Sequence, residues 1–287
     1  MNDNSPNQVT RLSTAAAASM LLWISRTLLA LLVSYPVLLS IRASGMASGP
    51  EGDAVLFQPG SLLLLELLRI GAPWLASAFR VALLLAFLSA IFELVPLALA
   101  LDLLWLPGRT LFERATRALR LFPTFFGLSA LALLLQAALI LAASLLGAAL
   151  KPALSSADER LRSIAPIALM GLGLVACAGL GGVLDIARAR LVQRGPGERG
   201  ARTAFAHALL CFRRQPFSVL AGVYPSVAGS ALGCLSAAWF LTRFTPSGSS
   251  SVALALAFGV HQLAVLFGIA WRVRWLGAAL TLSAERD

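Results

Sequence analysis

The chain has 287 residues, of which 59% are apolar and 13% are charged, and its mean hydropathy is +0.83. Soluble domains carry charge on about a quarter of their residues, so this composition excludes a soluble globular protein. Apolar runs recur along the whole chain, which also excludes a soluble domain with one anchor. The segments between them are too short for a soluble catalytic domain. We therefore expect an all-α, polytopic membrane protein.

A helix needs about 20 mostly apolar residues to cross the roughly 30 Å of hydrocarbon in a bilayer. Six stretches meet this requirement: 24–43, 74–104, 121–149, 164–186, 217–242 and 250–275. The first is the weakest, because Arg26 and Arg42 leave only fifteen uncharged residues between them. Both arginines can reach toward opposite headgroup layers, which keeps the span feasible. The alternative is a cleaved signal peptide, which N-terminal sequencing of the mature protein would reveal.

The basic residues are divided unevenly between the two sides of these spans. Numbering the connections alternately places sixteen lysines and arginines on the N-terminal side and seven on the other. Because basic residues accumulate on the cytoplasmic side, both termini are expected in the cytoplasm. Trp271 and Trp275 fall near the same boundary, as in an interfacial aromatic belt. This distribution accounts for the net charge of +10 without nucleic acid, and the sequence has no groove-reading or stacking element.

One arginine-bearing segment occurs twice, at an interval of 93 residues. It reads RTLFERATRALRLFP over 109–123 and RTAFAHALLCFRRQP over 202–216. Polar and apolar residues alternate at helical spacing in both copies, which predicts a basic amphipathic helix in the headgroup plane. In the second copy the apolar stripe is Phe205, Leu209 and Phe212. The closing proline disfavours helical geometry at the residue before it, so we expect a bend into the following span.

The first copy also contains a favourable charge order, since Glu113 precedes Arg117 by four residues. A third, fainter copy is expected at 13–25, because Arg26 lies 94 residues before Arg120. The motifs ALDLLW and VLDIAR match one another around the two aspartates, and SYPVLL and VYPSVA match around the two tyrosines.

These matches predict one integral membrane domain, 1–287, of three units that each combine an elbow helix with a helical hairpin. The units are 8–106, 107–192 and 193–287. The alternative is that the segments are not repeats but converged on similar sequences because each lies at the membrane interface. Segment 61–70 is expected to form a short helix on the outer surface.

The elbows RALRLFP and CFRRQPF and the segment LDIARARLV at 184–192 resemble the membrane domain that precedes some bacterial glycerophosphodiester phosphodiesterases. A wider group of six-span bacterial membrane proteins is similar. The resemblance covers nearly the whole chain and implies a multi-pass protein of the bacterial inner (plasma) membrane. It implies no catalytic residues, because this sequence contains nothing that resembles the phosphodiesterase domain.

Few polar residues lie deep inside the predicted spans. Glu93 lies nine residues before Asp102, which puts it about 13 Å inside the cytoplasmic edge. His261 lies at a similar depth with Gln262 beside it, and Gln136 is in the third span. An acid at such depth is costly and indicates a functional residue by default. Glu93 and His261 could share a proton or bind a polar substrate group; the alternative is a structural hydrogen bond between helices.

Other chemistry is not indicated. The cysteines lack the spacing of metal ligands, and the two histidines are far apart, so no metal or cofactor is expected. We expect free thiols that act as small apolar residues at Cys177, Cys211 and Cys234. Small residues at helical spacing in the fourth and fifth spans, among them Gly173 and Gly222, indicate close helix contact within the chain or in a homodimer.

The favoured function is therefore non-enzymatic: transport, lipid interaction, or a subunit role in a membrane complex. Its expected partner is the bilayer, whose anionic headgroups would bind arginines of the two elbows. These are Arg117, Arg120, Arg213 and Arg214. Other membrane proteins or a second copy are the protein partners to consider, and nucleic acid is not. The alternative function is an intramembrane enzyme or a proton-coupled permease that uses Glu93 and His261.

Overall fold

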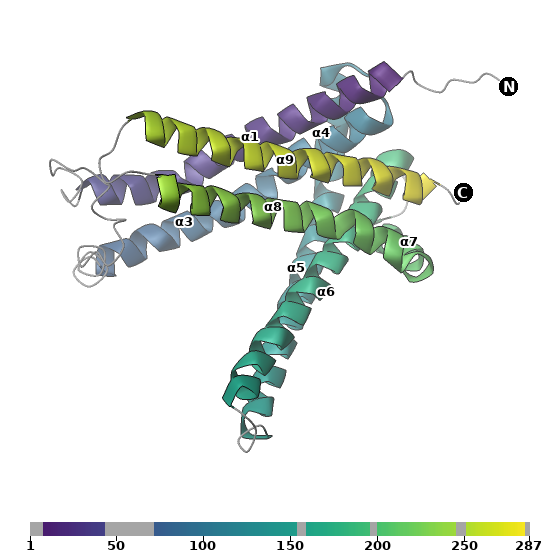
Figure 1. Ribbon diagram of the computed structural model, residues 1–287. Coiled ribbons are helices and arrows are strands. Elements are labelled where there is room, and N and C mark those ends of the chain that lie inside the picture. Colours follow the sequence, from purple (N-terminus) through teal and green to yellow (C-terminus); the bar gives the residue numbers. More distant parts are fainter. Residues whose placement is uncertain (1–7, 44–71, 154–158, 196–199, 245–250, 285–287) are drawn as a thin grey trace. The chain divides into compact units, whose positions relative to one another are not determined.

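The computed structural model describes residues 8–43, 72–153, 159–195, 200–244 and 251–284, and within them the chain is helical with no strand (Figure 1). The helices are α1 (Gln8–Ala43), α3 (Ala72–Phe92), α4 (Leu94–Trp105), α5 (Leu111–Ala153), α6 (Glu159–Arg194), α7 (Ala201–Arg214), α8 (Pro216–Phe244) and α9 (Ser251–Ala284). The all-α prediction is confirmed. The helix expected at 61–70 lies outside the described residues.

Five helical segments are long and apolar enough to cross a bilayer, as in a multi-pass membrane protein. They are Leu12–Pro36, Arg80–Trp105, Leu111–Leu150, Ile164–Arg194 and Phe258–Ala284. Large apolar side chains such as Leu134, Leu172 and Leu263 are exposed along them, which suits contact with lipid tails. The other predicted span, 217–242, falls within the 29-residue α8, and a sixth crossing stays a prediction.

The chain forms two compact units, each assembled from segments that are far apart in sequence. Unit 1 consists of Met1–Ala18, Ala98–Ala228 and Trp271–Asp287, and unit 2 of Ser19–Leu97 and Gly229–Ala270. Helices α1, α4, α8 and α9 therefore contribute residues to both units. The three sequence repeats stay a prediction.

The core of unit 1 is built around α6. In Figure 1, α5 and α6 lie side by side, and α7 packs against both. Every residue of α6 from 182 to 192 is buried, which requires neighbours on all its sides. Buried residues of α5 recur every three or four positions, as on one helix face. They are Arg114, Ala118, Leu121, Phe125, Leu128 and Ala132.

Only one of the expected elbow helices is separate from the helix that follows it. α7 has 14 residues, and α8 begins at Pro216 directly after it. Gln215 has φ −134° and ψ 56°, a non-helical geometry that suits a residue before proline. The second predicted elbow helix and its bend are thus confirmed as local structure.

The other two expected elbow helices are wrong. α5 continues from Leu111 through Pro123 to Ala153, and segment 13–25 lies within the continuous α1. Pro123 removes only its own N–H donor, and spanning helices tolerate such a loss. The buried face of α5 also keeps its spacing on both sides of Pro123, so packing against α6 favours an unbroken helix.

A third proline does mark a break. Glu93 alone separates α3 from α4, three residues before Pro96. Pro96 cannot donate a hydrogen bond to the carbonyl of Phe92, which interrupts the helix there. The bonds from Glu93 N to Ser89 O, 2.8 Å, and from Leu97 N to Glu93 O, 3.1 Å, carry the chain past the break. The helix pair therefore remains one candidate span.

Candidate functional site

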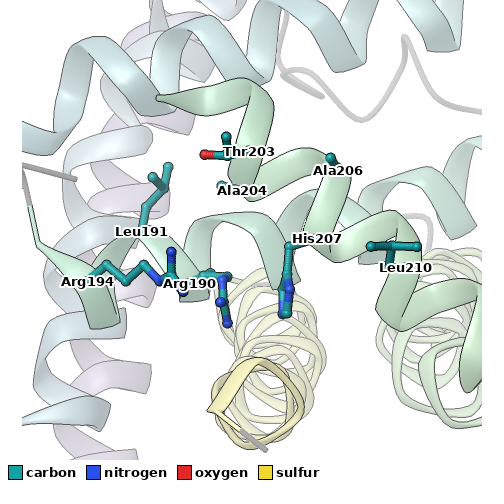
Figure 2. A pocket seen from close by; sticks show the side chains of 8 residues that line it. All are labelled: Arg190, Leu191, Arg194, Thr203, Ala204, Ala206, His207 and Leu210. Atoms are coloured by element: carbon teal, nitrogen blue, oxygen red, sulfur yellow. The ribbon is translucent and has the colours of Figure 1, made fainter. Parts of the chain in front are cut away.

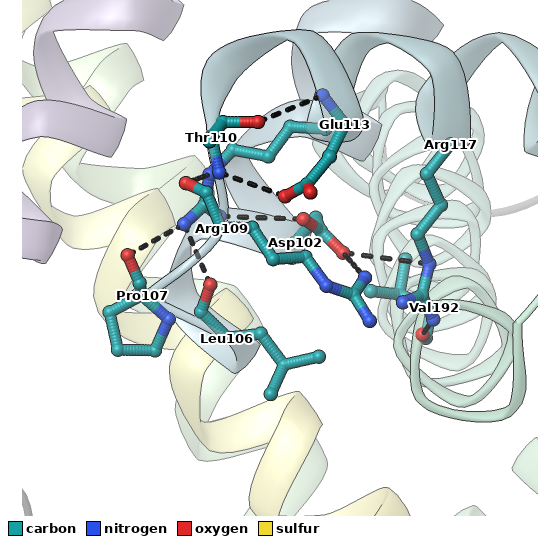
Figure 3. A network of polar contacts seen from close by, with 9 residues as sticks. Asp102, Leu106, Pro107, Arg109, Thr110, Glu113, Arg117 and Val192 are labelled. Atoms are coloured by element: carbon teal, nitrogen blue, oxygen red, sulfur yellow. Dashed lines mark hydrogen bonds and ion pairs between the residues drawn. The ribbon is translucent and has the colours of Figure 1, made fainter.

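Three arginines surround the buried carboxylate of Asp102, near the end of α4 in unit 1 (Figure 3). The Oδ1 atom lies 3.2 Å from Nη1 of Arg109 and 3.5 Å from Nε of Arg117. The Oδ2 atom lies 3.4 Å from Nη1 of Arg114. One carboxylate balances only one of these charges, so this cluster keeps a net positive charge.

Arg114 also holds the connection between α4 and α5 in place. Its side chain is buried, and it donates to the carbonyl oxygens of Leu106 at 2.7 Å, Pro107 at 2.8 Å and Arg109 at 3.0 Å. A buried guanidinium needs such partners because its desolvation is otherwise costly. The connection is consequently fixed by the same side chain that binds Asp102.

A capping box starts α5 immediately after this connection. The Thr110 hydroxyl accepts from the Glu113 N–H at 3.4 Å, and Oε2 of Glu113 accepts from the Thr110 N–H at 3.1 Å. The expected pair of Glu113 with Arg117 is therefore wrong. Arg117 turns away to Asp102 and donates to the carbonyl oxygen of Val192 on α6 (Figure 3).

A second buried aspartate, Asp185 on α6, joins three helices. Arg272 on α9 binds it as a fork, with Nη1 2.5 Å from Oδ2 and Nη2 2.6 Å from Oδ1. The Nε1–H of Trp275 donates to Oδ2 at 2.8 Å. Arg188 lies 3.4 Å from Oδ1 and donates to the Ser129 hydroxyl of α5 at 2.7 Å. This carboxylate is fully engaged, which fits a structural role.

Gly222 leaves room for the Trp275 ring, and Gly182 leaves room for the Val223 side chain. A Cβ atom at Gly222 would lie 2.1 Å from Cε3 of the Trp275 ring, and one at Gly182 would lie 2.5 Å from Cγ2 of Val223. Close contact within the chain at Gly222 is thereby confirmed. The Trp275 side chain is 2% exposed and packs inside unit 1, and its depth near the membrane boundary stays a prediction.

The arginines predicted to bind headgroups have two different environments. Arg120 on α5 and Arg213 and Arg214 at the end of α7 are exposed, and none has a carboxylate partner within the described ranges. Arg117 is instead held inside unit 1 by Asp102 and Val192. Three of the four are thus available to an external anion.

α7 presents different faces to the protein and to its surroundings. The face toward unit 1 is narrow and small, formed by the buried residues Ala204, Ala208 and Cys211. The predicted apolar stripe of Phe205, Leu209 and Phe212 lies beside it and is partly or fully exposed. An exposed apolar stripe next to Arg213 and Arg214 is typical of a helix that contacts lipid.

A pocket of about 300 Å³ lies between α6 and α7 (Figure 2). Arg190 and Arg194 line it from α6, and Thr203 and His207 line it from α7. The remaining lining residues are Leu191, Ala204, Ala206 and Leu210. None of the described residues around this pocket is acidic. Nη1 of Arg190 donates to the carbonyl oxygen of Ser283 at 2.9 Å, near the end of α9.

In unit 2, Glu93 pairs with an arginine and not with the predicted histidine. Its Oε1 lies 2.5 Å from Nε of Arg26, and Gln262 accepts from the Nε1–H of Trp23 at 3.0 Å. His261 is exposed and has no polar partner among the described residues. Glu93 and His261 therefore do not form an acid–base pair. The opposite charges of Arg26 and Glu93 are the sequence signal that could have indicated this pair.

The remaining deep polar group, Gln136, links α5 to α6. Its Nε2 donates to the Cys177 carbonyl at 3.1 Å, and the Cys177 thiol lies 3.7 Å from the Gln136 carbonyl. Cys177 and Cys211 are free thiols, as expected, and the Cys211 sulfur is 3.3 Å from Nε2 of His207. The Cys234 side chain lies outside the described residues. Within those that are described, no group of His, Cys, Asp or Glu could hold a metal ion.

Comparisons with family models, with curated proteins and with solved structures gave no match. The resemblance to the membrane domain of glycerophosphodiester phosphodiesterases therefore stays a prediction. The candidate site rests on its own geometry, in which positive charge gathers where the C-terminal end of α6, the first turns of α5 and the whole of α7 meet in unit 1.

Proposed function

We propose that the protein is a multi-pass protein of the inner membrane that binds anionic lipid headgroups through the arginine-rich end of unit 1. Binding of this kind suits a role in lipid organisation or transport, or as a subunit of a membrane complex. The observation that carries the proposal is the exposure of Arg120, Arg213 and Arg214 without carboxylate partners in the described structure, beside exposed apolar side chains of α7.

The internal contacts of unit 1 support this function over catalysis. Asp102 and Asp185 are buried and bound by arginines, so neither carboxylate is poised to act as a base. Asp102 neutralises one of the three arginine charges around it, so the cluster keeps a net positive charge. A positive surplus at one end of a membrane protein attracts the anionic leaflet.

The charge distribution supports a cytoplasmic orientation for this end. The sixteen basic residues on the predicted cytoplasmic side include every arginine of α5 and α7, and seven lie on the other side. We therefore propose that both termini are cytoplasmic and that α8 provides a sixth crossing.

The test is the binding of anionic lipid by purified protein. Each juxtamembrane arginine contributes about 1 kcal/mol, so Arg213→Gln with Arg214→Gln should weaken binding to phosphatidylglycerol vesicles roughly thirtyfold. The measurement is co-sedimentation of vesicles that contain 30 mol% phosphatidylglycerol (roughly the anionic fraction of a bacterial membrane) with detergent-depleted protein.

The matched control is Arg69→Gln with Arg80→Gln, which removes the same charge from the predicted opposite side. This control should retain nearly the full binding of the unaltered chain. Equal losses in the two double variants, or no loss in either, would refute headgroup binding by α7.

A further inference from the structure

We infer that the Arg26–Glu93 ion pair of unit 2 is the centre of a binding site for a zwitterionic group, which joins an oxyanion and an ammonium and is carried by a lipid headgroup or by a soluble solute. The site is separate from the proposed function, which depends on arginines of unit 1. Its support comes from the position of the pair in two candidate spans, from the polar atoms that the pairing leaves over, and from a buried hydroxyl one helical turn away.

The ion pair lies in the middle of two candidate spans. Arg26 is fourteen residues from the start and ten from the end of Leu12–Pro36. Glu93 is thirteen residues from the start and twelve from the end of Arg80–Trp105. At 1.5 Å per residue, each is about 15 Å or more from either end of its segment, which is half of the roughly 30 Å of hydrocarbon. Ionised side chains within spans pair with one another and mark the paths of polar substrates.

The pairing leaves polar atoms of both side chains for a ligand. Nε of Arg26 lies 2.5 Å from Oε1 of Glu93, and neither side chain has another polar partner in the described part of the chain. Both Nη groups of Arg26 and the Oε2 atom of Glu93 are therefore left over. The two side chains are 41% and 32% exposed, so the protein does not cover them. Charged groups are costly in hydrocarbon, and these need a polar group from outside the chain.

A buried hydroxyl and a carbonyl without its helical donor accompany the pair. Ser89 is 8% exposed, and its Oγ atom has no hydrogen-bond partner. Glu93 N donates to Ser89 O, so the two side chains lie one turn apart on the same face. Pro96 has no N–H to donate to the Phe92 carbonyl, which adds an acceptor. A buried hydroxyl without a partner is costly, and a polar ligand would satisfy it.

The chemistry of these groups selects a zwitterion. The Nη groups of Arg26 match the oxygens of a phosphate or a carboxylate. Oε2 of Glu93, the Ser89 hydroxyl and the Phe92 carbonyl are acceptors for an ammonium group. The charges of Arg26 and Glu93 cancel, so a ligand with a net charge would leave an unbalanced charge within the spans, whereas a net-neutral ligand would not. The headgroup of phosphatidylethanolamine has this chemistry, and so does the soluble compound glycerophosphoethanolamine.

The experiment has two arms, which separate the two sources of the zwitterion. In both, the chain carries Arg213→Gln with Arg214→Gln, so that the exposed arginines of α7 do not contribute. In the first arm, glycerophosphoethanolamine is titrated into protein in detergent by calorimetry. In the second, nanodiscs contain equal amounts of phosphatidylethanolamine and phosphatidylglycerol, and retained lipids are counted by native mass spectrometry. We expect binding of glycerophosphoethanolamine or retention of phosphatidylethanolamine over phosphatidylglycerol, and the probe that binds identifies the source.

Two variants test the site with the successful probe. Ser89→Ala should weaken binding several-fold and leave the thermal unfolding midpoint unchanged or higher, because its Oγ has no hydrogen bond to lose. Arg26→Gln with Glu93→Gln should weaken binding roughly tenfold or more, because charge-assisted hydrogen bonds are lost. The matched control, Glu66→Gln with Arg80→Gln, removes one charge of each sign elsewhere in the sequence and should change binding less than twofold.

Three results would overturn the inference: neither probe binds, Ser89→Ala binds as tightly as its parent chain, or the two double variants weaken binding equally. If Arg26→Gln with Glu93→Gln does not fold, Ser89→Ala decides alone. Vesicle binding by Arg213 and Arg214 is measured separately, so the headgroup function of unit 1 stands or falls independently of this site.

Discussion

At the scale of single residues, the side chain of Trp275 shows how an apolar chain positions a buried charge. Its indole N–H is one of the donors to Asp185, and its ring occupies the space that Gly222 leaves open. A larger residue at 222 would push the ring away from the carboxylate. Gly222 therefore supports the hydrogen bond from Trp275 to Asp185 on α6 as well as the packing of α8.

Gly222→Ala should destabilise the protein by about 1–3 kcal/mol, because the added methyl group overlaps a rigid, buried ring. The matched control is Gly127→Ala on α5, where a Cβ atom meets nothing within 4 Å. That change should be neutral or stabilising, since alanine favours helix. The measurement is the thermal unfolding midpoint in detergent, followed by tryptophan fluorescence. Similar unfolding midpoints for Gly222→Ala and Gly127→Ala would contradict the close packing of Gly222 against Trp275.

At the scale of elements, α7 owes its position to the small residues on its buried face. Ala204, Ala208 and Cys211 allow close approach to α6, so the arginines at its end and the pocket beside it are held together. An interfacial helix without a buried face of small residues contacts lipid and not the rest of the protein. α7 is anchored to the protein on one side and exposes large apolar residues on another.

Ala208→Leu should lift α7 from α6, because Ala208 has no exposed surface. Cys211, which is 8% exposed, should then react faster with a maleimide. The measurement is the labelling rate in a background with Cys177→Ala and Cys234→Ala. Ala206→Leu, at an exposed position on the same helix, should leave the rate within twofold. Slow labelling of Cys211 in both variants would mean that the buried face of α7 accommodates a larger side chain without moving away from α6.

The two copies of the arginine segment show where sequence prediction reaches its limit. Both end in proline, yet only Pro216 begins a new helix, while Pro123 lies within α5. Both segments therefore predict a bend from their local sequence alone. α5 nevertheless stays continuous because it packs a buried face against α6, and this packing depends on residues distant in sequence.

At the scale of the whole molecule, composition alone predicted the helical class, and five helical segments of the described residues are long and apolar enough to cross a bilayer, where six crossings were predicted. It also indicated that α7 is amphipathic. The motif around each aspartate was visible as a repeat, but the partner of Asp185 was not, because Arg272 lies 87 residues further along the chain. The pocket between α6 and α7 has no linear signature, since residues of two helices line it.

The number of crossings sets the orientation of the termini. Six crossings place both termini on one side, whereas five would place them on opposite sides. We expect reporters fused at the N- and C-termini to indicate the cytoplasm, and cysteines introduced at Lys151 and Ser247 to react with an impermeant reagent from outside the cell. The control is Arg120→Cys, on the predicted inner side, which should be protected in intact cells. Opposite locations of the termini would exclude α8 as a sixth span.

The distance in sequence between Asp185 and Arg272 has a consequence for biosynthesis. Asp102 meets all three of its arginines within the next fifteen residues, so its neutralisation is complete soon after it leaves the ribosome. Asp185 must wait in the nascent chain for α9, with Arg188 as its early companion. The ion pair of Asp185 is therefore completed only when α9 has emerged, and a ribosome that stalls before α9 releases a chain whose Asp185 lacks its main counterion.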